Sequence, residues 1–417
     1  MDKRRVVITG VGSVNPLAHT MRETWPRLKA GESGVDRITR FDPVELGLET
    51  HIAWEVKGFD PTDRMDARAA RRMDRFGHLG VAAAGEAIGA AGLVVDDHNR
   101  DRIGVLFATG VGGLETIVKQ EDVRQTRGPK RVSPLSVPML MPNAAAGNIG
   151  LQHGIRGLGM ALASACASSN DAIGMALAAI QMGWADAVVA GGTEAYVVPI
   201  AIAGFNQAGA LSTARNDEPQ RASRPFDKDR DGFVVAEMGS ALILETLEGA
   251  RARGAPILAE LAGYGASMDA HHITAPAPDG NGAVRAMRAA LESGGVPLEE
   301  IDYISAHGTS TPINDPIETQ AIKEVFGERA YRIPVSAIKS MTGHSAGGCG
   351  AFEAAALALG VAEGFAPPTI NYETPDPECD LDYVPNAGRE VQIRAALSNN
   401  FGFGGHNSCI VLRRVDS

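Results

Sequence analysis

Residues 163–182 read ASACASSNDAIGMALAAIQM, and residues 342–363 read TGHSAGGCGAFEAAALALGVAE. In both stretches a turn of small residues leads into an alanine-rich helix. Short β-branched strands alternate with such helices along the chain, which indicates a layered α/β fold. Because the pattern occurs twice, we predict two similar halves that cover residues 1–255 and 256–417.

Six strands and five helices stand out in this pattern. The expected strands are rich in β-branched residues and cover 5–9, 103–108, 187–190, 241–245, 301–306 and 409–412. The expected helices are rich in alanine and cover 66–91, 167–182, 282–293, 316–326 and 348–363.

The composition excludes several classes of protein. Lys and Arg number 39 and Asp and Glu number 50, and the resulting net charge of −11 argues against a general nucleic-acid binder. Glycine accounts for 49 of 417 residues and aromatic residues for 5%. Such a chain packs its backbone closely and uses glycine where backbone meets ligand. The four cysteines lie far apart, so we expect neither a zinc site nor a disulfide framework.

A charge-poor stretch runs from residue 132 to residue 214. Its only formal charges are Arg156, Asp171, Asp186 and Glu194. Prolines and glycines interrupt it, so we predict a core or a subunit interface and no membrane segment. The N-terminal MDKRRVVITG has a basic tip but no cleavage region, and we interpret it as the first strand of a soluble cytoplasmic protein.

Cys166 is the first candidate nucleophile. All its neighbours from Ala163 to Asn170 are small, which leaves room for a substrate. We expect the following helix to begin at or just after the cysteine. Unpaired N–H groups and the positive end of the helix dipole would then lower the thiol pKa and favour a thiolate at neutral pH. On this segment alone, a buried structural cysteine is an equally good interpretation.

Three further turns of small residues each hold a reactive side chain. SAHGTSTP at 305–312 follows an expected strand, where α/β folds place ligands, although a capping turn around a core histidine is also possible. KSMTGHSAGG at 339–348 places Lys339 and His344 five residues apart before a helix. NNFGFGGHN at 399–407 is a glycine loop with two of the few aromatic residues. Packing alone does not explain four such turns.

Two motif matches point to other chemistry. GVGG at 110–113 is followed by Glu115 where the dinucleotide-binding fingerprint needs glycine. GHSAG at 343–347 matches the nucleophile elbow of serine hydrolases and acyltransferases. Ser345 would be the nucleophile, with its possible partners Asp376, Asp380 or Asp382 and His406. The polar KSMT before the motif and the short chain after it argue against this alternative.

Together these segments resemble the elongating β-ketoacyl-acyl carrier protein synthases, types I and II and most closely type II, of the thiolase-like superfamily. The similarity covers essentially the whole chain. Its segments are VVITGVG at 6–12, RPFDKDRDGF at 224–233, AHGTSTP at 306–312, KSMTGHSAGG at 339–348, NYETPDPECDLD at 371–382 and FGFGGHN at 401–407. One cysteine with two histidines distinguishes this group from the initiating synthases and from the thiolases proper.

The resemblance implies a duplicated thiolase-like fold layered α-β-α-β-α, a homodimer and no bound cofactor. Substrates are carried on the phosphopantetheine of an acyl carrier protein. By the same resemblance, Cys166 forms an acyl-enzyme, and N–H groups of Cys166 and Phe403 form the oxyanion hole. His307 and His344 stabilise the enolate that forms as malonyl-carrier loses CO₂, and a 3-ketoacyl chain results. Lys339, paired with Glu318, orients this site.

The resemblance also implies substrate contacts. These are Thr309 and Thr311 for phosphopantetheine, Val111 on the wall of an acyl tunnel, and Phe401 and Gly404 beside a rotating Phe403 gate. Val111 occupies a position that is often the bulkier isoleucine, which predicts a shift toward medium or long acyl chains.

A basic cluster is the expected docking surface for the acidic carrier protein. It comprises Arg64, Arg68, Arg71, Arg72 and Arg75, expected on one helix, with Lys130 and Arg131 nearby. The plainer interpretation is a solvated helix face paired to Asp63, Asp66 and Asp74.

The pathway stays open at the level of sequence. His406 replaces the threonine common in the last loop, and the 212–215 segment is one residue longer than usual. Fatty acid elongation is the first interpretation and a polyketide ketosynthase the alternative. An inactive scaffold subunit is disfavoured because Cys166 is present.

Overall fold

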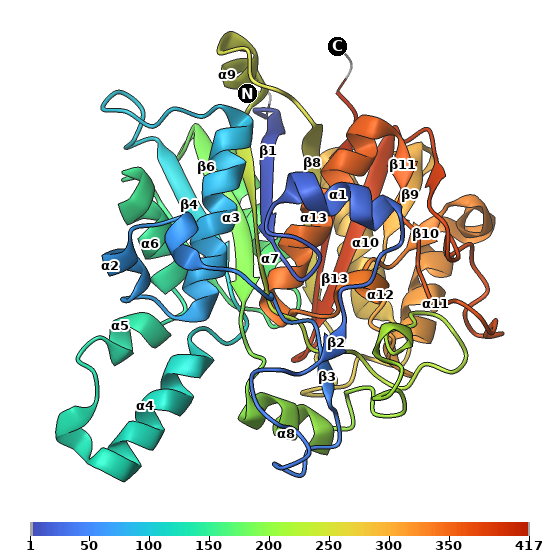
Figure 1. Ribbon diagram of the computed structural model, residues 1–417. Helices are drawn as coiled ribbons and strands as arrows, with labels where there is room; N and C mark the ends of the chain where they lie inside the picture. The colour runs from blue at the N-terminus through green and yellow to red at the C-terminus, as the bar shows by residue number, and fades with distance from the viewer. Residues whose placement is uncertain (1–2, 416–417) are drawn as a thin grey trace.

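The structure is a computed structural model that describes residues 3–415 and contains a mixed sheet of ten strands (Figure 1). In spatial order the strands are β10 (Val335–Ser336), β9 (Ile301–Ser305), β13 (Ala395–Gly402), β14 (His406–Arg413), β8 (Ala259–Met268), β1 (Val6–Val14), β7 (Met238–Thr246), β6 (Ala187–Glu194), β4 (Ile103–Ala108) and β5 (Gly159–Leu162). Two small ribbons pair β2 (Asp36–Arg37) with β3 (Ile52–Ala53) and β11 (Phe365–Ala366) with β12 (Arg389–Glu390).

Each half of this sheet has the same topology. The order β1-β7-β6-β4-β5 in the first half matches β8-β14-β13-β9-β10 in the second. In both halves the first two pairings are antiparallel and the last two are parallel. The halves join where β1 pairs with β8 over two residues, Val7 with Glu260 and Ile8 with Ala259.

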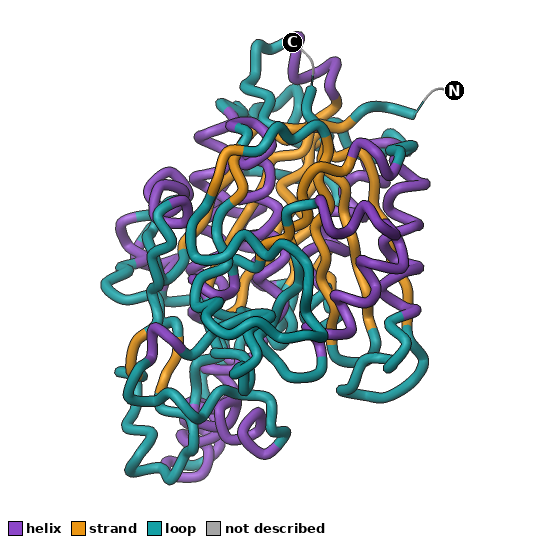
Figure 2. The backbone as a smooth tube through the Cα atoms, turned by 90° about the vertical axis from the view of Figure 1, so that its right-hand side faces the viewer, coloured by secondary structure: helices purple, strands orange, loops and turns teal. Residues whose placement is uncertain are grey.

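The helices form three layers around the two half-sheets (Figures 1 and 2). Their bounds are α1 (Met21–Lys29), α2 (Ala67–Ala70), α3 (Arg75–Ala91), α4 (Leu114–Arg127), α5 (Ser136–Leu140), α6 (Ala144–His153), α7 (Ser168–Gln181), α8 (Pro199–Gln207), α9 (Leu247–Ala252), α10 (Asn281–Gly294), α11 (Asn314–Phe326), α12 (Lys339–Thr342) and α13 (Cys349–Glu363). Helices α3 and α6 cover the first half, and α10 and α11 cover the second. Helices α7 and α13 contact each other and strands of both halves, so they form the middle layer. The predicted duplicated α-β-α-β-α fold is confirmed.

Glycines on the first strand of each half allow an alanine-rich helix to pack at very short range. A Cβ atom on Gly10 of β1 would lie 2.4 Å from the Ala87 carbonyl oxygen of α3. A Cβ atom on Gly263 of β8 would lie 2.2 Å from the Ala290 carbonyl oxygen of α10. The same contact therefore recurs at equivalent positions, and it explains the high glycine and alanine content.

Most of the expected elements are present, and one expected helix is wrong. The span 66–91 is two helices, because residues 71–74 interrupt it and Asp74 caps α3 by accepting a hydrogen bond from the Phe76 N–H. Strands β8 and β13 were not expected: two glycines lie in β8, and the buried Asn399 and Asn400 lie in β13. Both compositions are poor in the β-branched residues that mark a strand in sequence.

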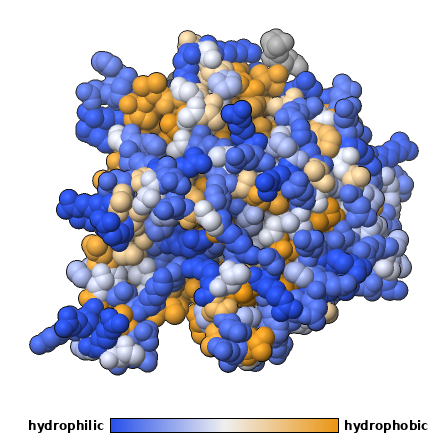
Figure 3. All heavy atoms as spheres, viewed as in Figure 1, coloured by the Kyte–Doolittle hydropathy of each residue, from blue (hydrophilic) through white to orange (hydrophobic). Residues whose placement is uncertain are grey.

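Loops and short helices gather at one end of the sheet and carry the candidate site. Strands β4, β6, β9 and β13 all end there, followed by the turns singled out in the sequence. Helices α4 and α5 project from this end as an arm, and α8 lies beside it (Figure 1). Figure 3 shows a notch between the arm and the rest of the molecule.

The close approach of β8 and α10 gives a direct test of the packing. We expect Gly263→Ala to lower the free energy of unfolding by about 1–3 kcal/mol, because the new methyl group meets backbone that cannot move aside. The control is Gly89→Ala, on an exposed position of α3 with no atom within 4 Å of the new Cβ, which should stabilise by up to about 1 kcal/mol. Urea unfolding of both variants measures the difference; equal effects would contradict the packing argument.

Candidate active site

Four turns from different parts of the chain converge at the N-terminal ends of the two middle helices. Cys166 precedes α7, His344 precedes α13, His307 follows β9, and Phe403 lies in the turn between β13 and β14. His344 Nε2 lies 3.1 Å from Cys166 Sγ, and the His307 and His344 ring centroids are 5.5 Å apart. The structure therefore brings the three residues of the expected catalytic set together.

A strained turn presents Cys166. Ala165, directly before it, has a φ angle of +52°, a conformation that costs a residue with a Cβ atom roughly 1–2 kcal/mol. Gly402 allows the end of β13 to approach this turn, because a Cβ there would lie 2.9 Å from the Cys166 nitrogen. Burial raises the pKa of the Cys166 thiol, and the N–H groups of Phe403 and of Cys166 itself partly oppose that rise.

The prediction of a neutral-pH thiolate is wrong for the resting structure. Burial raises the pKa of the Cys166 thiol to about 11, against the opposing effects of Lys339 and the Phe403 N–H. Helix α7 begins only at Ser168, so the helix dipole acts from two residues away. The thiol proton must therefore leave during the reaction.

His344 is the nitrogen base closest to that proton. Its imidazole stacks edge-on with Phe233 at 5.1 Å, and its carbonyl accepts a 2.6 Å hydrogen bond from the Tyr196 hydroxyl. Burial, and then the charge of Lys339, lowers the pKa of His344 well below its usual value, so the ring is neutral. Its Nδ1 is buried with no hydrogen-bond partner among the described residues, so no contact on that side fixes the tautomer.

His307 is held in one tautomer. Its Nδ1 lies 3.4 Å from Lys339 Nζ, and because an ammonium can only donate, Nδ1 accepts and the ring proton is on Nε2. Burial and the Lys339 charge lower the pKa of His307 well below its usual value. His307 is thus a neutral ring that presents an N–H donor to the site.

Lys339 does not pair with Glu318, and this part of the prediction is wrong. Lys339 forms a buried ion pair with Glu353 of α13 and donates a 2.7 Å hydrogen bond to the His307 carbonyl. Burial opposes the ammonium, yet Glu353 holds the pKa of Lys339 above its usual value. Glu318 instead accepts 2.8 Å hydrogen bonds from the N–H groups of His307 and Gly308, so it fixes the backbone of the histidine turn.

Two functional carboxylates were missed from the sequence. Glu353 is the one charge of the alanine-rich α13 before its last residue, Glu363, and that isolation is the signal that could have identified it. Glu194, one of the four charges in the charge-poor stretch, is buried at the end of β6. It accepts hydrogen bonds from the Thr109 hydroxyl and from the N–H groups of Gly110 and Gly347, which ties the turn after β4 to the His344 turn. Burial raises the pKa of Glu194 to about 7.

Three of the residues expected to contact the substrate lie in the turns of this centre or directly beside them: Thr309, Thr311 and Phe401. The Thr309 and Thr311 hydroxyls lie 2.9 Å apart, although the loop is not extended, since Ser310 between them has a φ angle of +68°. Phe401 lies 5.6 Å from the His307 ring.

The gate and tunnel residues lie nearer the surface. Phe403 is 37% exposed and contacts Phe205 at 6.4 Å, and the Gly404 N–H donates a 2.7 Å hydrogen bond to the Ile273 carbonyl. Val111 is 42% exposed in the single chain, so no enclosed tunnel wall forms around it there.

The basic cluster lies away from this centre and is smaller than expected. Arg75 turns inward and forms a bidentate pair with the fully buried Glu237, so it is not part of an exposed surface. Asp74, expected as a solvated partner of these arginines, is buried as the cap of α3. The six remaining basic residues of the cluster are exposed: Arg64, Arg68, Arg71, Arg72, Lys130 and Arg131.

The serine-nucleophile alternative is not supported by the geometry. Ser345 follows the short helix α12 rather than a strand, and its hydroxyl is buried with no hydrogen-bond partner among the described residues. The candidate carboxylates are each paired elsewhere: Asp376 with Arg230, Asp380 with Lys323 and Asp382 with Arg389.

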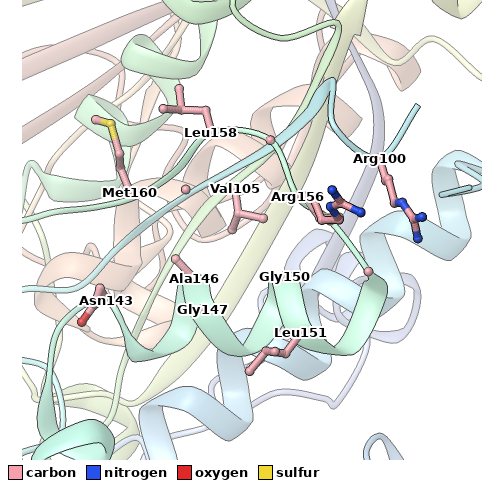
Figure 4. A pocket seen from close by; sticks show the side chains of 14 residues that line it. Arg100, Val105, Asn143, Ala146, Gly147, Gly150, Leu151, Arg156, Leu158 and Met160 are labelled. Carbon is pink, nitrogen blue, oxygen red and sulfur yellow. The ribbon is translucent and has the colours of Figure 1, made fainter. Parts of the chain in front are cut away.

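A hollow of about 450 Å³ lies apart from this centre, between α6 and the edge strand β5. Figure 4 shows Val105, Leu158 and Met160 above it and Ala146 and Leu151 on the helix below. Its lining includes no residue of the catalytic set.

Comparisons with known proteins identify the family of the chain. The β-ketoacyl synthase N-terminal domain model matches residues 3–250, and the C-terminal domain model matches residues 258–373. A protein named 3-oxoacyl-[acyl-carrier-protein] synthase 2 from Synechocystis is 49% identical over 414 residues, 99% of each chain. The protein of the same name from Staphylococcus aureus N315 is 46% identical over 416 residues, 100% of each chain.

Solved structures share the fold over nearly the whole chain. The ishigamide ketosynthase/chain length factor superimposes with a TM-score of 0.93 at 37% identity, covering 99% of this chain and 100% of that chain. A β-ketoacyl synthase from Burkholderia phymatum STM815 gives 0.92 at 37% identity with the same coverage. The two family models and the full-length relatives define an acyl-transferring condensing enzyme. The chain belongs to the β-ketoacyl synthase family.

None of the helices within residues 3–415 is both long and apolar enough to cross a bilayer.

The raised pKa of Cys166 predicts the pH dependence of its alkylation. Because only the thiolate reacts, the iodoacetamide rate at Cys166 should rise about tenfold per pH unit from pH 7 to pH 9 with no plateau. Peptide mass spectrometry measures this rate against Cys349, Cys379 and Cys409, which are buried and should stay unmodified in the folded protein. A plateau below pH 8, or faster labelling of another cysteine, would contradict the assignment.

Proposed function

We propose that this protein catalyses the decarboxylative condensation that elongates fatty acids. Cys166 accepts an acyl group from acyl carrier protein, and malonyl-acyl carrier protein then extends it to a 3-ketoacyl chain. The observation that carries this proposal is the 3.1 Å contact between Cys166 Sγ and His344 Nε2 in a buried site that also holds His307. Full-length relatives named 3-oxoacyl-acyl-carrier-protein synthase 2 support it.

The first half-reaction forms the acyl-enzyme. Sγ of Cys166 attacks the acyl carbonyl, and the N–H groups of Cys166 and Phe403 stabilise the oxyanion. His344 Nε2 takes the thiol proton and returns it to the departing phosphopantetheine thiolate, so that the carrier leaves as a free thiol. The unfixed tautomer of His344 suits a ring that first accepts a proton and later donates one.

The second half-reaction consumes malonyl-carrier. The bond between the malonyl carboxylate and its α-carbon breaks, CO₂ leaves, and the electron pair forms an enolate on the thioester. Nε2–H of His307 donates to that enolate oxygen, and His344 is the second donor. The α-carbon then attacks the Cys166 thioester, the C–S bond breaks, and the cysteine leaves as a thiolate that takes up one proton from solvent to restore the resting thiol. Neutral imidazoles are suited to this step because they donate without protonating the carbanion.

Supporting groups position these reactants. Lys339, neutralised by Glu353, fixes the His307 tautomer, and Glu318 fixes the His307 backbone. The adjacent Thr309 and Thr311 hydroxyls are placed to bind phosphopantetheine. Phe403, flanked by glycines, acts as a gate above Cys166, with Phe401 and Gly404 in the same loop, and Val111 lines the acyl path. No bound cofactor takes part.

A polyketide ketosynthase is the second candidate. The observation that favours it is the similarity to the ishigamide ketosynthase and to a type II ketosynthase solved with its acyl-carrier protein, at 37% and 36% identity. The higher identity of the relatives named 3-oxoacyl-acyl-carrier-protein synthase 2 supports fatty acid elongation first.

A second copy of the chain is proposed at the β5 edge. This strand ends the sheet with its outer edge unpaired by any described strand. Met160 on it and Leu151 on α6 are exposed beside the hollow of Figure 4, within the charge-poor stretch. Apolar side chains beside an open strand edge favour a homodimer.

The carrier protein is proposed to dock on the exposed basic residues near α2 and the η2 turn (Pro129–Arg131). Arg64, Arg68 and Arg72 form no ion pair with any of residues 3–415, unlike the inward Arg75. Unpaired cations on a chain of net charge −11 are suited to an acidic partner.

Substitution of the nucleophile separates the two half-reactions. Cys166→Gln should abolish condensation, at least about a thousandfold, yet retain decarboxylation of malonyl-carrier, because the histidine pair is intact. Ser345→Ala, which removes an unpaired buried hydroxyl, should keep condensation within a fewfold of the parent. Radiolabelled CO₂ release and product chromatography measure both. Loss of condensation in Ser345→Ala with retention in Cys166→Gln would reverse the assignment.

Charge reversal tests the docking surface. Arg68→Glu with Arg72→Glu should raise the Michaelis constant for carrier-borne substrates about tenfold at low salt, and less as salt increases. Small thioester substrates should be unaffected. The control, Arg288→Glu with Arg332→Glu, makes the same charge change on the second half. Docking is elsewhere if both double variants behave alike, or if the small substrates are affected equally.

A further inference from the structure

Three side chains from separate elements meet beside the strained cysteine turn. Asp171, on the first turn of α7, accepts a hydrogen bond from the Ser164 hydroxyl through Oδ2. Its other oxygen, Oδ1, accepts a 2.9 Å hydrogen bond from the Tyr264 hydroxyl of β8. We call Ser164, Asp171 and Tyr264 the carboxylate brace.

The brace grips the turn next to its strained residue. Ser164 directly precedes Ala165, the residue with the φ angle of +52°. On the inner side, the Ser168 hydroxyl accepts from the Ser164 N–H at 2.8 Å and donates to the Ala165 carbonyl at 2.5 Å. A strained turn persists only where its surroundings hold it, and here side chains hold both of its flanks.

The brace also spans the two halves of the molecule. Ser164 and Asp171 belong to the first half, whereas Tyr264 lies on β8 of the second and pairs across to Ile410 of β14. The tyrosine ring packs on Gly174 of α7, where a Cβ atom would lie 2.2 Å from it. Strand β14 continues from the turn that carries the Phe403 N–H. The brace therefore links the cysteine turn to the half that supplies the second oxyanion donor.

The charge of Asp171 has no other partner among residues 3–415. No ion pair involves Asp171, so the carboxylate is stabilised by two hydroxyl donors and by the N-terminus of α7. Burial, and then the Asp171 charge, raises the pKa of Tyr264, so the phenol stays protonated and donates. A hydroxyl-to-carboxylate bond is shorter and stronger than a neutral one, which suits a fixed link.

We propose that Asp171 is a positioning residue for the acyl transfer to Cys166. Held between Ser164 and Tyr264, it sets the cysteine turn against the N–H groups of Cys166 and Phe403. The inference rests on the proposed function, because it concerns the step in which Cys166 is acylated. Loss of the brace misaligns the sulfur and the oxyanion donors, while the histidine pair stays in place on its own supports.

Single-turnover acylation by saturating acyl-carrier tests this role, with the Cys166 adduct followed by intact mass. Asp171→Ala should slow acylation about tenfold or more, since small misplacement of a reacting group has large kinetic effects. Asp171→Asn should recover much of that loss, because its amide oxygen still accepts from one hydroxyl. Tyr264→Phe should slow acylation less than Asp171→Ala, and Tyr331→Phe, at an exposed position, should be without effect.

A second measurement separates misplacement of the cysteine turn from a general loss of active-site structure. Malonyl decarboxylation in the Cys166→Gln background should be the same within twofold with and without Asp171→Ala. The inference is overturned if decarboxylation is lost in parallel, or if Asp171→Ala is acylated within twofold of the parent. If Asp171→Ala does not fold, the same comparison with Tyr264→Phe decides. Failure of the parent itself to acylate Cys166 would instead overturn the proposed function.

Discussion

The contact between α7 and α13, packed between two half-sheets, is the constraint on which the rest of the molecule depends. These helices meet through very small residues: a Cβ on Gly350 of α13 would lie 2.9 Å from Asn170 Oδ1 and 3.1 Å from the Asn170 nitrogen of α7. Each helix follows a turn with one reactive side chain, Cys166 or His344. Because the helix ends abut, the sulfur and the imidazole lie within hydrogen-bond distance.

Burial at this centre then determines its electrostatics. It raises the pKa of the Cys166 thiol and lowers those of both histidines, so these three side chains are uncharged at rest beside the Lys339–Glu353 ion pair. Breaking a buried ion pair by removing one partner costs about 3–5 kcal/mol in comparable proteins. The lysine of this pair holds the ring proton of His307 on Nε2. The pair therefore serves the chemistry of the site as well as its stability.

The sequence was most informative where runs of small residues, and the alternation of strands with alanine-rich helices, mark buried backbone. The span 103–108 matches β4, and 167–182 and 348–363 match α7 and α13 within about one residue. It was least informative where tertiary contacts override local pattern. The break in the helix over 66–91 depends on Asp74 bonding to the distant Thr116 N–H, and the Lys339 partner depends on helix packing that spacing alone does not determine. The thiol pKa was misjudged because local dipoles are visible in a sequence and depth of burial is not.

The central claim is that Cys166 carries the growing acyl chain and gives it up to malonyl-carrier. Incubation with acyl-carrier, followed by peptide mass spectrometry, should find the acyl mass on the peptide containing Cys166. Addition of malonyl-carrier should remove that adduct and produce a 3-ketoacyl chain two carbons longer. An acyl group on Ser345 or on another cysteine, or an adduct on Cys166 that persists after malonyl-carrier is added, would contradict the account.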